Sequence, residues 1–471
     1  MRCVKIISFA LILGFVVPIR GFAQSEKEVI QRGAYVARAA DCTGCHTNAG
    51  EKPFAGDFIL ASPLGNIIAT NITPSKQYGI GNWNEEQFTK AIRQGISPTR
   101  YLYPAMPYTA YAELSDADVH ALYLYFMKVV KPVDNKPERI TSLDFPFNQR
   151  WLMMGWNMIF ARKQPWEKAP PEQDNIKRGE YLVKVLEHCS TCHTPRNILM
   201  GEKESQFLGG GFFAGWYVPN ITSDPISGIG RWSNDELVSY LRSGTAHWKS
   251  QAAGSMAESI ENSLRHLPDQ DLQAIAAYLK TVPPIRTHGQ IRPAFSFTGA
   301  KPVNMALLDY AIDRNPNAMT DKTTTDGQTL YVAACATCHQ LDGQGTKDQF
   351  YPSLTANSAT GGMFYNNTVM VILNGIQRKT NDGIVFMPGF GNEMNDIQIA
   401  NLANYIFERF GNDSLKVTAE QVKLLRLGGE RPIIAKIVLP IGGVILLTVV
   451  GIIYIKRKRR RQRYRHLSSK R

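Results

Sequence analysis

The sequence lacks the residue patterns on which many enzymes depend. Its 471 residues contain no serine–histidine constellation, no paired-carboxylate arrangement, no phosphate-binding loop and no glycine-rich dinucleotide fingerprint. Basic residues interleaved with aromatic ones, the usual footprint of nucleic-acid binding, are also missing between the two ends of the chain. We therefore expect no nucleic-acid partner and no catalysis by side chains alone.

Cysteine is scarce, and its distribution is uneven. Six of the seven cysteines stand in three copies of the pattern C-x-x-C-H, and only Cys3 lies outside it. This pattern is the attachment signal for c-type haem, whose iron takes the adjacent histidine as its proximal ligand. A zinc site would need a second pair of ligands, and a redox dithiol would need a βαβ context; the sequence offers neither. It therefore predicts three covalently bound haem c groups, with Cys42, Cys45, Cys189, Cys192, Cys335 and Cys338 as attachment residues and His46, His193 and His339 as iron ligands.

Long apolar runs are almost absent as well. The N-terminal run, Ile6 to Pro18, is too short to cross a bilayer; it follows Arg2 and Lys5 and precedes the small-residue stretch 21–23. These features predict a secretory signal peptide over residues 1–23, with an uncleaved anchor as the alternative. Export agrees with haem attachment, which takes place on the outer side of the bacterial inner membrane.

One apolar run is long enough to span a membrane. Residues 437–455 form a 19-residue stretch without a charge, and residues 456–471, which follow, contain ten Lys or Arg and no acid. By the positive-inside rule the tail is cytoplasmic and everything before the helix is periplasmic. We predict one transmembrane helix in the bacterial inner membrane; a buried core helix with a basic tail is the alternative.

The excess of positive charge is confined to the two ends. Of the formal net charge of +13, the basic tail contributes ten and Arg2, Lys5 and Arg20 contribute three. Residues 24–455 are therefore about neutral. We therefore interpret the positive charge of the two ends as a sign of membrane topology and of contact with the inner leaflet.

The three motifs divide the chain into three similar units. Each motif ends a short helical stretch that carries a glycine and an aromatic residue, and each unit closes with an amphipathic helix that begins at acidic residues. The pattern resembles the crossed terminal helices of the class I cytochrome c fold, where glycine lets two backbones approach closely. We predict a mainly α fold with three class I cytochrome c-like domains in tandem and one C-terminal transmembrane helix. The predicted boundaries are 1–23 (signal peptide), 24–135 (domain 1), 136–170 (linker), 171–285 (domain 2), 286–320 (linker), 321–412 (domain 3), 413–436 (linker), 437–455 (transmembrane helix) and 456–471 (cytoplasmic tail).

The first two units share further sequence. Asn71-Ile-Thr73 and Asn220-Ile-Thr222 are each followed, at the same offset, by Gly-Ile-Gly and a tryptophan, Trp83 or Trp232. These two units therefore look like duplicates, and the third is more distant. The Asn-Ile-Thr sequon has little weight as a glycosylation site. A turn that places Asn or Trp against the haem edge and a purely structural turn remain equally open.

The segment 151–160 is strongly apolar but too short to span a membrane. We favour a satellite core that fills the groove between the first two domains. The alternative is a docking face for a partner subunit or for the lipid surface.

The sixth ligand of each iron is expected among the methionines, because electron-transfer haems of this kind are usually His/Met ligated. Met106 and Met387 each precede a proline on an extended segment, shortly before the last helix of their unit. Met256 has the corresponding position in the second unit but lacks the proline. We predict these three as distal ligands, with His247 and His266 as competitors of Met256.

Longer motifs carry a resemblance to a known family, over roughly residues 28–412. They are 33–42, 70–74 with 79–81, and 102–108 in the first unit, 178–182, 192–196 and 215–222 in the second, and 351–354 and 387–390 in the third. Together they resemble the tri-haem cytochrome c subunit of bacterial membrane-bound periplasmic dehydrogenases. This family comprises the quinoprotein alcohol dehydrogenase type and the flavin-dependent gluconate, 2-ketogluconate, sorbitol and fructose dehydrogenase type.

The resemblance implies that this chain does not oxidise the substrate itself. In that family a partner dehydrogenase subunit holds flavin or pyrroloquinoline quinone (PQQ), and three haems carry its electrons to ubiquinone in the membrane. It implies the proximal histidines and distal methionines named above, a large and a small partner subunit, and ubiquinone as acceptor. The predicted C-terminal helix favours the flavin-dependent type. The alternatives are a haem enzyme acting on a small molecule such as peroxide or nitrite, and an accessory cytochrome c that delivers electrons to a terminal oxidase.

Overall fold

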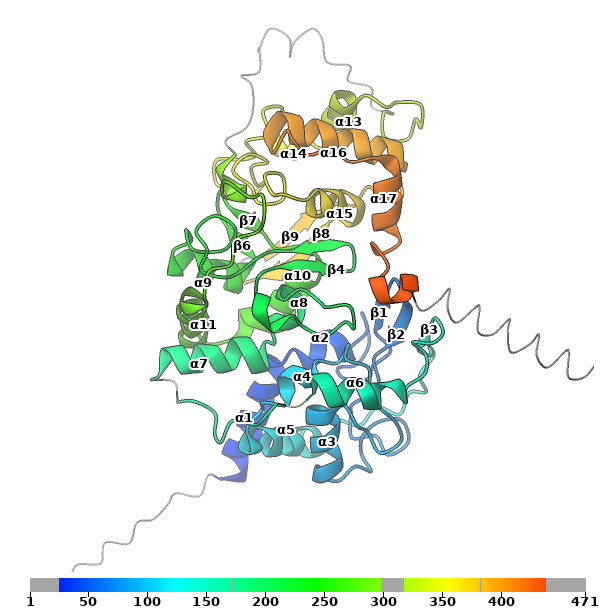
Figure 1. Ribbon diagram of the computed structural model, residues 1–471, viewed down its shortest axis with the longest axis vertical. Coiled ribbons are helices and arrows are strands. Elements are labelled where there is room, and N and C mark those ends of the chain that lie inside the picture. The colour runs from blue at the N-terminus through cyan, green and yellow to red at the C-terminus, as the bar shows by residue number, and fades with distance from the viewer. Residues whose placement is uncertain (1–24, 162, 172, 298–316, 382, 438–471) are drawn as a thin grey trace, which may run out of the picture.

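The computed structural model describes residues 25–161, 163–171, 173–297, 317–381 and 383–437 (Figure 1). The predicted signal peptide, the basic tail and all but the first residue of the predicted transmembrane segment lie outside these ranges. Among the helices within them, none is long and apolar enough to cross a membrane. The described chain forms three units that follow one another in chain order along the long axis of the molecule, from the blue unit to the orange one in Figure 1.

The first unit contains helices and a small sheet. The helices are α1 (Glu26–Ala39), α2 (Cys42–His46), α3 (Glu85–Gln94), α4 (Tyr108–Tyr111) and α5 (Asp116–Lys128). Strand β2 (Gly65–Ile68) pairs with β1 (Ile59–Ser62) on one side and with β3 (Ser142–Leu143) on the other. The longer helices begin where a side chain accepts a hydrogen bond from a first-turn backbone N–H, at Ser25, Asn84 and Ser115.

The second unit repeats this order with more irregular elements. Its helices are α7 (Asn175–Tyr181), which continues as one π-helical turn η1 (Leu182–Leu186), then α8 (Ser190–His193), α9 (Asn234–Ser243), α10 (Gly254–Asn262) and α11 (Asp269–Thr281), with 3₁₀ turns η2 (Glu204–Gln206), η3 (Leu264–His266) and, beyond α11, η4 (Ala294–Ser296). Two antiparallel hairpins lie between them, β4 (Gly211–Phe213) with β5 (Trp216–Val218), and β6 (Thr245–Ala246) with β7 (Ser250–Gln251).

The third unit is plainer. It consists of α13 (Gly327–Ala334), α14 (Ala336–His339), α15 (Asn366–Asn374), the hairpin β8 (Ile376–Thr380) and β9 (Gly383–Met387), and α16 (Asp396–Phe410). Segment 413–436, predicted as a linker, contains α17 (Ala419–Arg426), whose Val422 and Leu425 are buried in the core of this unit.

The opening and closing helices of each unit cross at a glycine, as the sequence predicts. A Cβ added to Gly33 of α1 would lie 2.0 Å from the carbonyl oxygen of Ala121 in α5. On Gly179 of α7 it would lie at the same 2.0 Å from the carbonyl oxygen of Ala274 in α11. At the third crossing, a Cβ added to Gly327 of α13 would lie 2.6 Å from the carbonyl oxygen of Asn401 in α16. Any side chain would push these backbones apart, so the crossing requires glycine.

The first two units share one buried core, whereas the third has its own. Buried apolar residues of α1 and α5 belong to the same cluster as those of α7, η1 and α11. The core of the third unit is built from α13, α15, α16 and α17. The first two units therefore behave as one folded body.

Two swapped polar contacts connect these two units. The hydroxyl of Tyr35 in the first donates to Asp271 Oδ2 in the second at 2.5 Å, and Tyr181 in the second donates to Asp118 Oδ2 in the first at 2.7 Å. Each carboxylate also accepts hydrogen bonds from Nε and Nη2 of an arginine in its own unit, Arg32 for Asp118 and Arg178 for Asp271. Since equivalent residues make equivalent contacts, the two units pack with approximate two-fold symmetry.

The apolar segment 151–160 forms α6 (Leu152–Phe160) beside the first unit (Figure 1). Its inner side contacts Tyr108, whose hydroxyl donates to Asn157 Oδ1 at 2.7 Å, and Trp156 Nε1 donates to the carbonyl of Leu199 in the second unit at 2.9 Å. No residue of the helix is buried. Met154, Met158 and Ile159 are exposed on its outer side, so α6 bridges the two units without forming a closed satellite core.

Candidate haem sites

Each C-x-x-C-H motif forms one short helical turn directly after the opening helix of its unit, namely α2, α8 and α14. None of the six cysteines is paired in a disulfide. Burial raises the pKa of Cys42, Cys45 and Cys335 to about 12, so these sulfurs are neutral thiols at pH 7. Within the described ranges, no group of three or more His, Cys, Asp or Glu is arranged to hold a metal ion. The donors therefore suit covalent attachment of haem better than a zinc–thiolate site.

The motif histidines are held identically in all three units. His46 Nδ1 lies 2.6 Å from the carbonyl oxygen of Thr70, His193 Nδ1 lies 2.7 Å from that of Pro219, and His339 Nδ1 lies 2.8 Å from that of Pro352. A carbonyl can only accept, so Nδ1 carries the proton and Nε2 keeps its lone pair. Burial lowers the pKa of each ring, which keeps it neutral. These are the properties that an iron ligand bonded through Nε2 needs.

The carbonyl that holds each histidine directly precedes a buried polar turn. In the first unit Asn71 Oδ1 accepts from the backbone N–H of Thr73 at 2.8 Å and from its hydroxyl at 2.7 Å, and Asn71 Nδ2 donates to the carbonyl of Val133 at 2.8 Å. Asn220 repeats these contacts with Thr222 and Ile285. The Asn-Ile-Thr motif is thus a structural turn placed next to the histidine support. Its Asn side chains are buried and hydrogen bonded, which excludes glycosylation in the folded state.

Sequence reasoning missed the third copy of this turn. After Pro352, the hydroxyl of Ser353 accepts from the backbone N–H of Thr355 at 3.1 Å and lies 2.8 Å from the Thr355 hydroxyl. Ser-Leu-Thr therefore replaces Asn-Ile-Thr. The sequence signal for this turn is a polar residue followed two positions later by threonine. This pattern is too common to identify the turn until the carbonyls that face the three histidines are compared.

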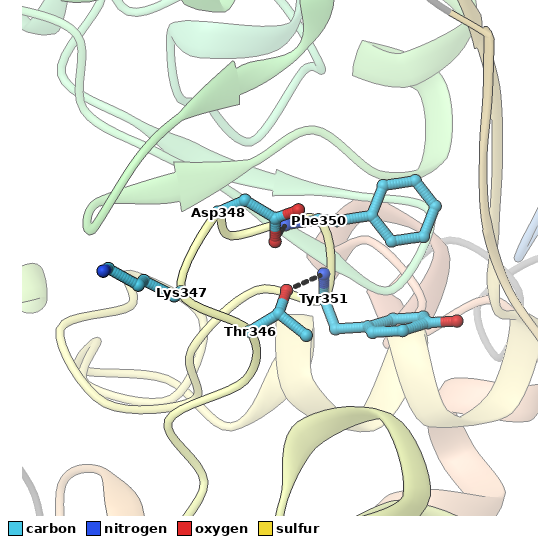
Figure 2. Close-up of a pocket in the computed structure, with 5 residues that line it drawn as sticks. All are labelled: Thr346, Lys347, Asp348, Phe350 and Tyr351. Carbon is cyan, nitrogen blue, oxygen red and sulfur yellow. Dashed lines mark hydrogen bonds between the residues drawn. The ribbon is translucent and has the colours of Figure 1, made fainter.

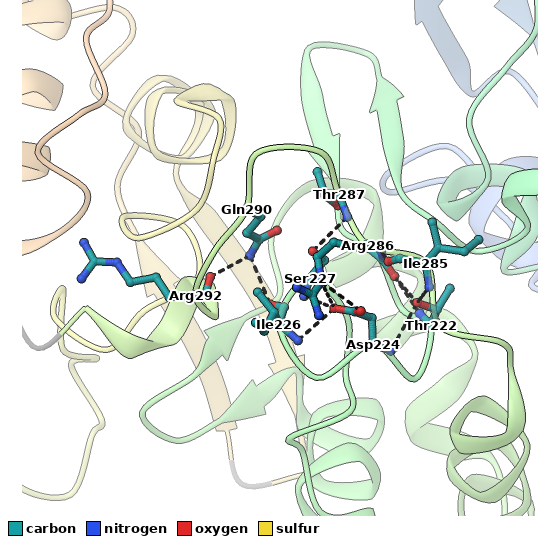
Figure 3. A network of polar contacts seen from close by, with 10 residues as sticks. Thr222, Asp224, Ile226, Ser227, Ile285, Arg286, Thr287, Gln290 and Arg292 are labelled. Atoms are coloured by element: carbon teal, nitrogen blue, oxygen red, sulfur yellow. Dashed lines mark hydrogen bonds and ion pairs between the residues drawn. The ribbon is translucent and has the colours of Figure 1, made fainter.

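Figure 3 shows how the turn of the second unit is anchored to the segment after the closing helix. Arg286 Nε donates to Asp224 Oδ1 and Oδ2 at 2.9 and 3.0 Å, and the backbone N–H groups of Ile226 and Ser227 donate to Oδ1 at 2.9 and 2.7 Å. Burial alone would raise the pKa of Asp224, but these hydrogen bonds and the positive charge bring it below its ordinary value. The carboxylate is thus ionised and fixes the loop behind the histidine.

The methionines predicted as distal ligands have corresponding positions in chain order, although Met106 lies in the bend before α4, Met256 in the first turn of α10 and Met387 at the end of β9. In each unit the preceding helix ends at a glycine with positive φ, Gly95 (65°), Gly244 (79°) or Gly375 (72°). A hairpin or bridged turn follows, and the methionine stands eleven residues after the glycine in the first unit and twelve in the others. All three methionines, Met106, Met256 and Met387, are partly buried against the cores.

The first two units share a backbone hydrogen bond that supports Met256 as the counterpart of Met106. The backbone N–H of Leu102 donates to the carbonyl of Gly95 at 2.7 Å, and that of Ala252 donates to the carbonyl of Gly244 at 2.8 Å. Met106 and Met256 each follow this closing residue by four positions. Met256 therefore has the place of Met106, although it lacks the neighbouring proline.

The competing histidines point to other surroundings. His247 is exposed in the turn between β6 and β7. His266 is exposed at the end of η3, and its Nε2 lies 3.1 Å from the carbonyl oxygen of Glu261. The geometry thus favours Met256 over both.

The first two motifs lie side by side although they are far apart in the sequence. The hydroxyl of Tyr111 donates at 2.7 Å to the carbonyl of Ala40, two residues before Cys42. The ring of Tyr111 meets that of His188, the residue before Cys189, edge to face at 5.5 Å between centroids. The third motif lies in the separate core of the third unit, toward the other end of the molecule (Figure 1).

A hollow of about 750 Å³ lies beside the third motif and is lined by one loop, Thr346, Lys347, Asp348, Phe350 and Tyr351 (Figure 2). The hydroxyl of Thr346 accepts from the backbone N–H of Tyr351 at 3.0 Å. Pro352, whose carbonyl holds His339, follows directly. The loop thus belongs to the histidine side of this site.

Comparisons with known proteins identify the kind of domain that carries these motifs. The family model described as "Cytochrome c" matches residues 324–408, and that described as "Cytochrome C oxidase, cbb3-type, subunit III" matches residues 28–126. The oxidase description is thus limited to the first unit.

Similar proteins also align with most of the chain. A fructose dehydrogenase cytochrome subunit from Gluconobacter japonicus is 45% identical over 91% of this chain and 88% of its own length. The gluconate 2-dehydrogenase cytochrome c subunit from Pantoea cypripedii is 35% identical over 86% of this chain and 90% of its own. The cytochrome c subunit of a quinone alcohol dehydrogenase from Komagataeibacter europaeus is 35% identical over 85% of each chain. The chain therefore belongs to the family of cytochrome c subunits of bacterial dehydrogenases, electron-transfer proteins with covalently bound haem c.

Proposed function

We propose that this chain carries electrons through three haem c groups from a dehydrogenase subunit to ubiquinone. The observation that carries the proposal is the threefold recurrence of one arrangement. In each unit two cysteines that form no disulfide precede a histidine whose Nδ1 faces a carbonyl, and a methionine follows a helix that ends at a glycine. The protein's part is to hold the three groups in place and to tune each through its ligands and burial.

In this proposal His46, His193 and His339 are the proximal ligands and Met106, Met256 and Met387 the distal ones. When bound, the haem groups supply one-electron redox chemistry. The support for Met256 is its equivalence to Met106, and the support for neutral histidines is their burial and their Nδ1 contacts.

The partner in this proposal is a dehydrogenase large subunit with a flavin, accompanied by a small subunit; PQQ is the other candidate cofactor. The substrate is an alcohol, a sugar or a sugar acid. Because the relative with 45% identity is a fructose dehydrogenase subunit, a ketose or related sugar is the first substrate to test. The domains occupy the boundaries given above, except that the third includes α17; the haem domains lie in the periplasm, and residues 437–455 anchor them in the inner membrane.

Purification of the full chain from solubilised membranes tests the proposal. We expect a dehydrogenase subunit to co-purify, and substrate to reduce three haem c equivalents, which ubiquinone then reoxidises. A complex without a dehydrogenase, or haems that substrate cannot reduce, would refute it.

The ligand assignment is tested separately in the purified complex. Met256→Leu should remove about one third of the sulfur-to-iron absorption and let carbon monoxide bind at one haem equivalent. Met200→Leu is the matched control, because Met200 lies in the same unit and is exposed. If the absorption is unchanged in the Met256 variant, the ligand is another residue.

A further inference from the structure

Arg378 is buried in a way that neither the sequence nor the proposed function explains. It stands on β8 of the third unit, its exposed fraction is 0%, and it is the largest fully buried side chain in the described part of the protein. All of the hydrogen-bond partners of its side chain belong to the second unit. Nε donates to the carbonyl of Ser243 at 2.8 Å, and Nη1 donates to the carbonyl of Ala252 at 2.5 Å.

The remaining donors of Arg378 complete this contact. Nη2 lies 3.2 Å from Thr245 Oγ1 and 3.1 Å from Gln251 Oε1. No Asp or Glu within the described ranges forms an ion pair with Arg378. The charge is therefore balanced only by neutral oxygens, an arrangement that is costly unless each hydrogen bond is made.

These acceptors form the base of the segment that leads to Met256. Ser243 and Gly244 end α9, Thr245 and Gln251 face each other across the β6–β7 hairpin, and Ala252 precedes Met256 by four residues. Gly244 packs against the guanidinium, because a Cβ there would lie 2.5 Å from Arg378 Nε. The arginine thus fixes both ends of the hairpin.

In the first unit the corresponding turn is supported by Tyr108 and by Arg150, which lies in the segment after α5. The ring of Tyr108 packs on Gly95, where a Cβ would lie 2.6 Å from it. Arg150 Nη1 donates to the carbonyl of Tyr101 at 3.0 Å, and its guanidinium lies 4.2 Å from the ring centroid of Tyr103. In the second unit this supporting role passes to a residue of another unit.

The hairpin that carries Arg378 also carries Met387. Strands β8 and β9 pair antiparallel, with Ile376 opposite Met387 and Arg378 opposite Val385. One two-stranded element therefore contacts the segment of Met256 and carries Met387.

We propose that Arg378 is a positioning residue for the second haem, which makes the third unit part of the second haem site. It holds the Met256 segment by four hydrogen bonds and adds a buried positive charge that disfavours the oxidised, more positive state of the haem. This inference rests on the proposed function, specifically on Met256 as distal ligand.

The test uses the purified holo-complex and three variants. Arg378→Met removes the charge and the hydrogen bonds, and Arg378→Lys keeps the charge but loses the planar, forked set of donors. Gln377→Ala is the control, because Gln377 precedes Arg378 on β8 and its side chain is exposed. Redox titration and the sulfur-to-iron absorption are the readouts.

We expect Arg378→Met to lower the potential of one haem and to remove up to one third of the sulfur-to-iron absorption. Arg378→Lys should recover most of the potential but not all of the absorption, and Gln377→Ala should change neither. Unchanged potentials and absorption in both folded Arg378 variants would overturn the inference. If Arg378→Met does not fold, the lysine variant alone decides.

Met256→Leu, measured in parallel, separates the two proposals. If it removes the absorption while the Arg378 variants do not, only the positioning role fails. If it leaves the absorption intact, the ligand assignment fails and the positioning role falls with it.

Discussion

Replacement of Gly179 by alanine tests the helix crossing that builds each unit. The added Cβ would lie 2.0 Å from the carbonyl oxygen of Ala274 and 2.7 Å from Tyr278 Cβ. Since Cβ atoms need at least about 3.0 Å, α7 and α11 would have to separate by roughly 1 Å. Such overpacking costs about 3 kcal/mol, and the better helix propensity of alanine returns about 1 kcal/mol. We expect a net loss of about 2 kcal/mol, roughly a 30-fold change in the unfolding equilibrium.

The assay is urea unfolding of the full-length protein, followed by far-UV circular dichroism and haem absorbance. Gly155→Ala is the matched control, because Gly155 also lies in a helix, α6, and an added Cβ there has no neighbour within 4 Å. We expect this control to be neutral or stabilising by up to about 1 kcal/mol. If Gly179→Ala unfolds at the same urea concentration as the unmodified protein, the close crossing is wrong.

Three further perturbations test the remaining contacts. Asn71→Ala removes three buried hydrogen bonds and should cost about 2–3 kcal/mol; an equal cost for Asn82→Ala, which loses one exposed hydrogen bond, would contradict the turn assignment. The folded-state pKa of Asp224 lies below its ordinary value, so its stabilisation is present above about pH 4 and is lost as the pH falls through the folded pKa. Arg286→Gln should therefore lower stability at pH 7, and on acidification the variant should unfold at a higher pH than the unmodified protein. An unchanged acid midpoint would argue against the ion pair. Tyr35→Phe should cost about 1–2 kcal/mol and lower the thermal transition of the first two units together; separate transitions for these units would contradict their shared core.

Part of the fold could be predicted because it depends on local pattern. Glycine and aromatic residues at fixed places around each motif predicted crossed helices, and Gly33, Gly179 and Gly327 lie at those crossings. The cytochrome c nature of the domains and the family were also predicted correctly. The place of α6 between the first two units was predicted, but its exposure and the shared core of these units were not, because they depend on which exposed faces meet after each unit has folded.

The candidate sites divide in the same way. The attachment residues are contiguous in the chain, so C-x-x-C-H was sufficient to locate them. The carbonyls of Thr70, Pro219 and Pro352 were missed, since any residue has a carbonyl and its direction depends on the loop. The Ser-Leu-Thr turn was missed because its sequence differs from Asn-Ile-Thr, although serine and asparagine can accept the same backbone hydrogen bond.

The sequence by itself determined the number of attachment motifs, the glycine crossings and the family. Each of these rests on residues close together or on a spacing that the backbone repeats. Only the tertiary structure decided that Tyr35 and Tyr181 exchange partners and that Arg378 reaches from the third unit into the second. The physical reason is that a buried hydroxyl or guanidinium must find acceptors, and which acceptors are within reach depends on how the units pack.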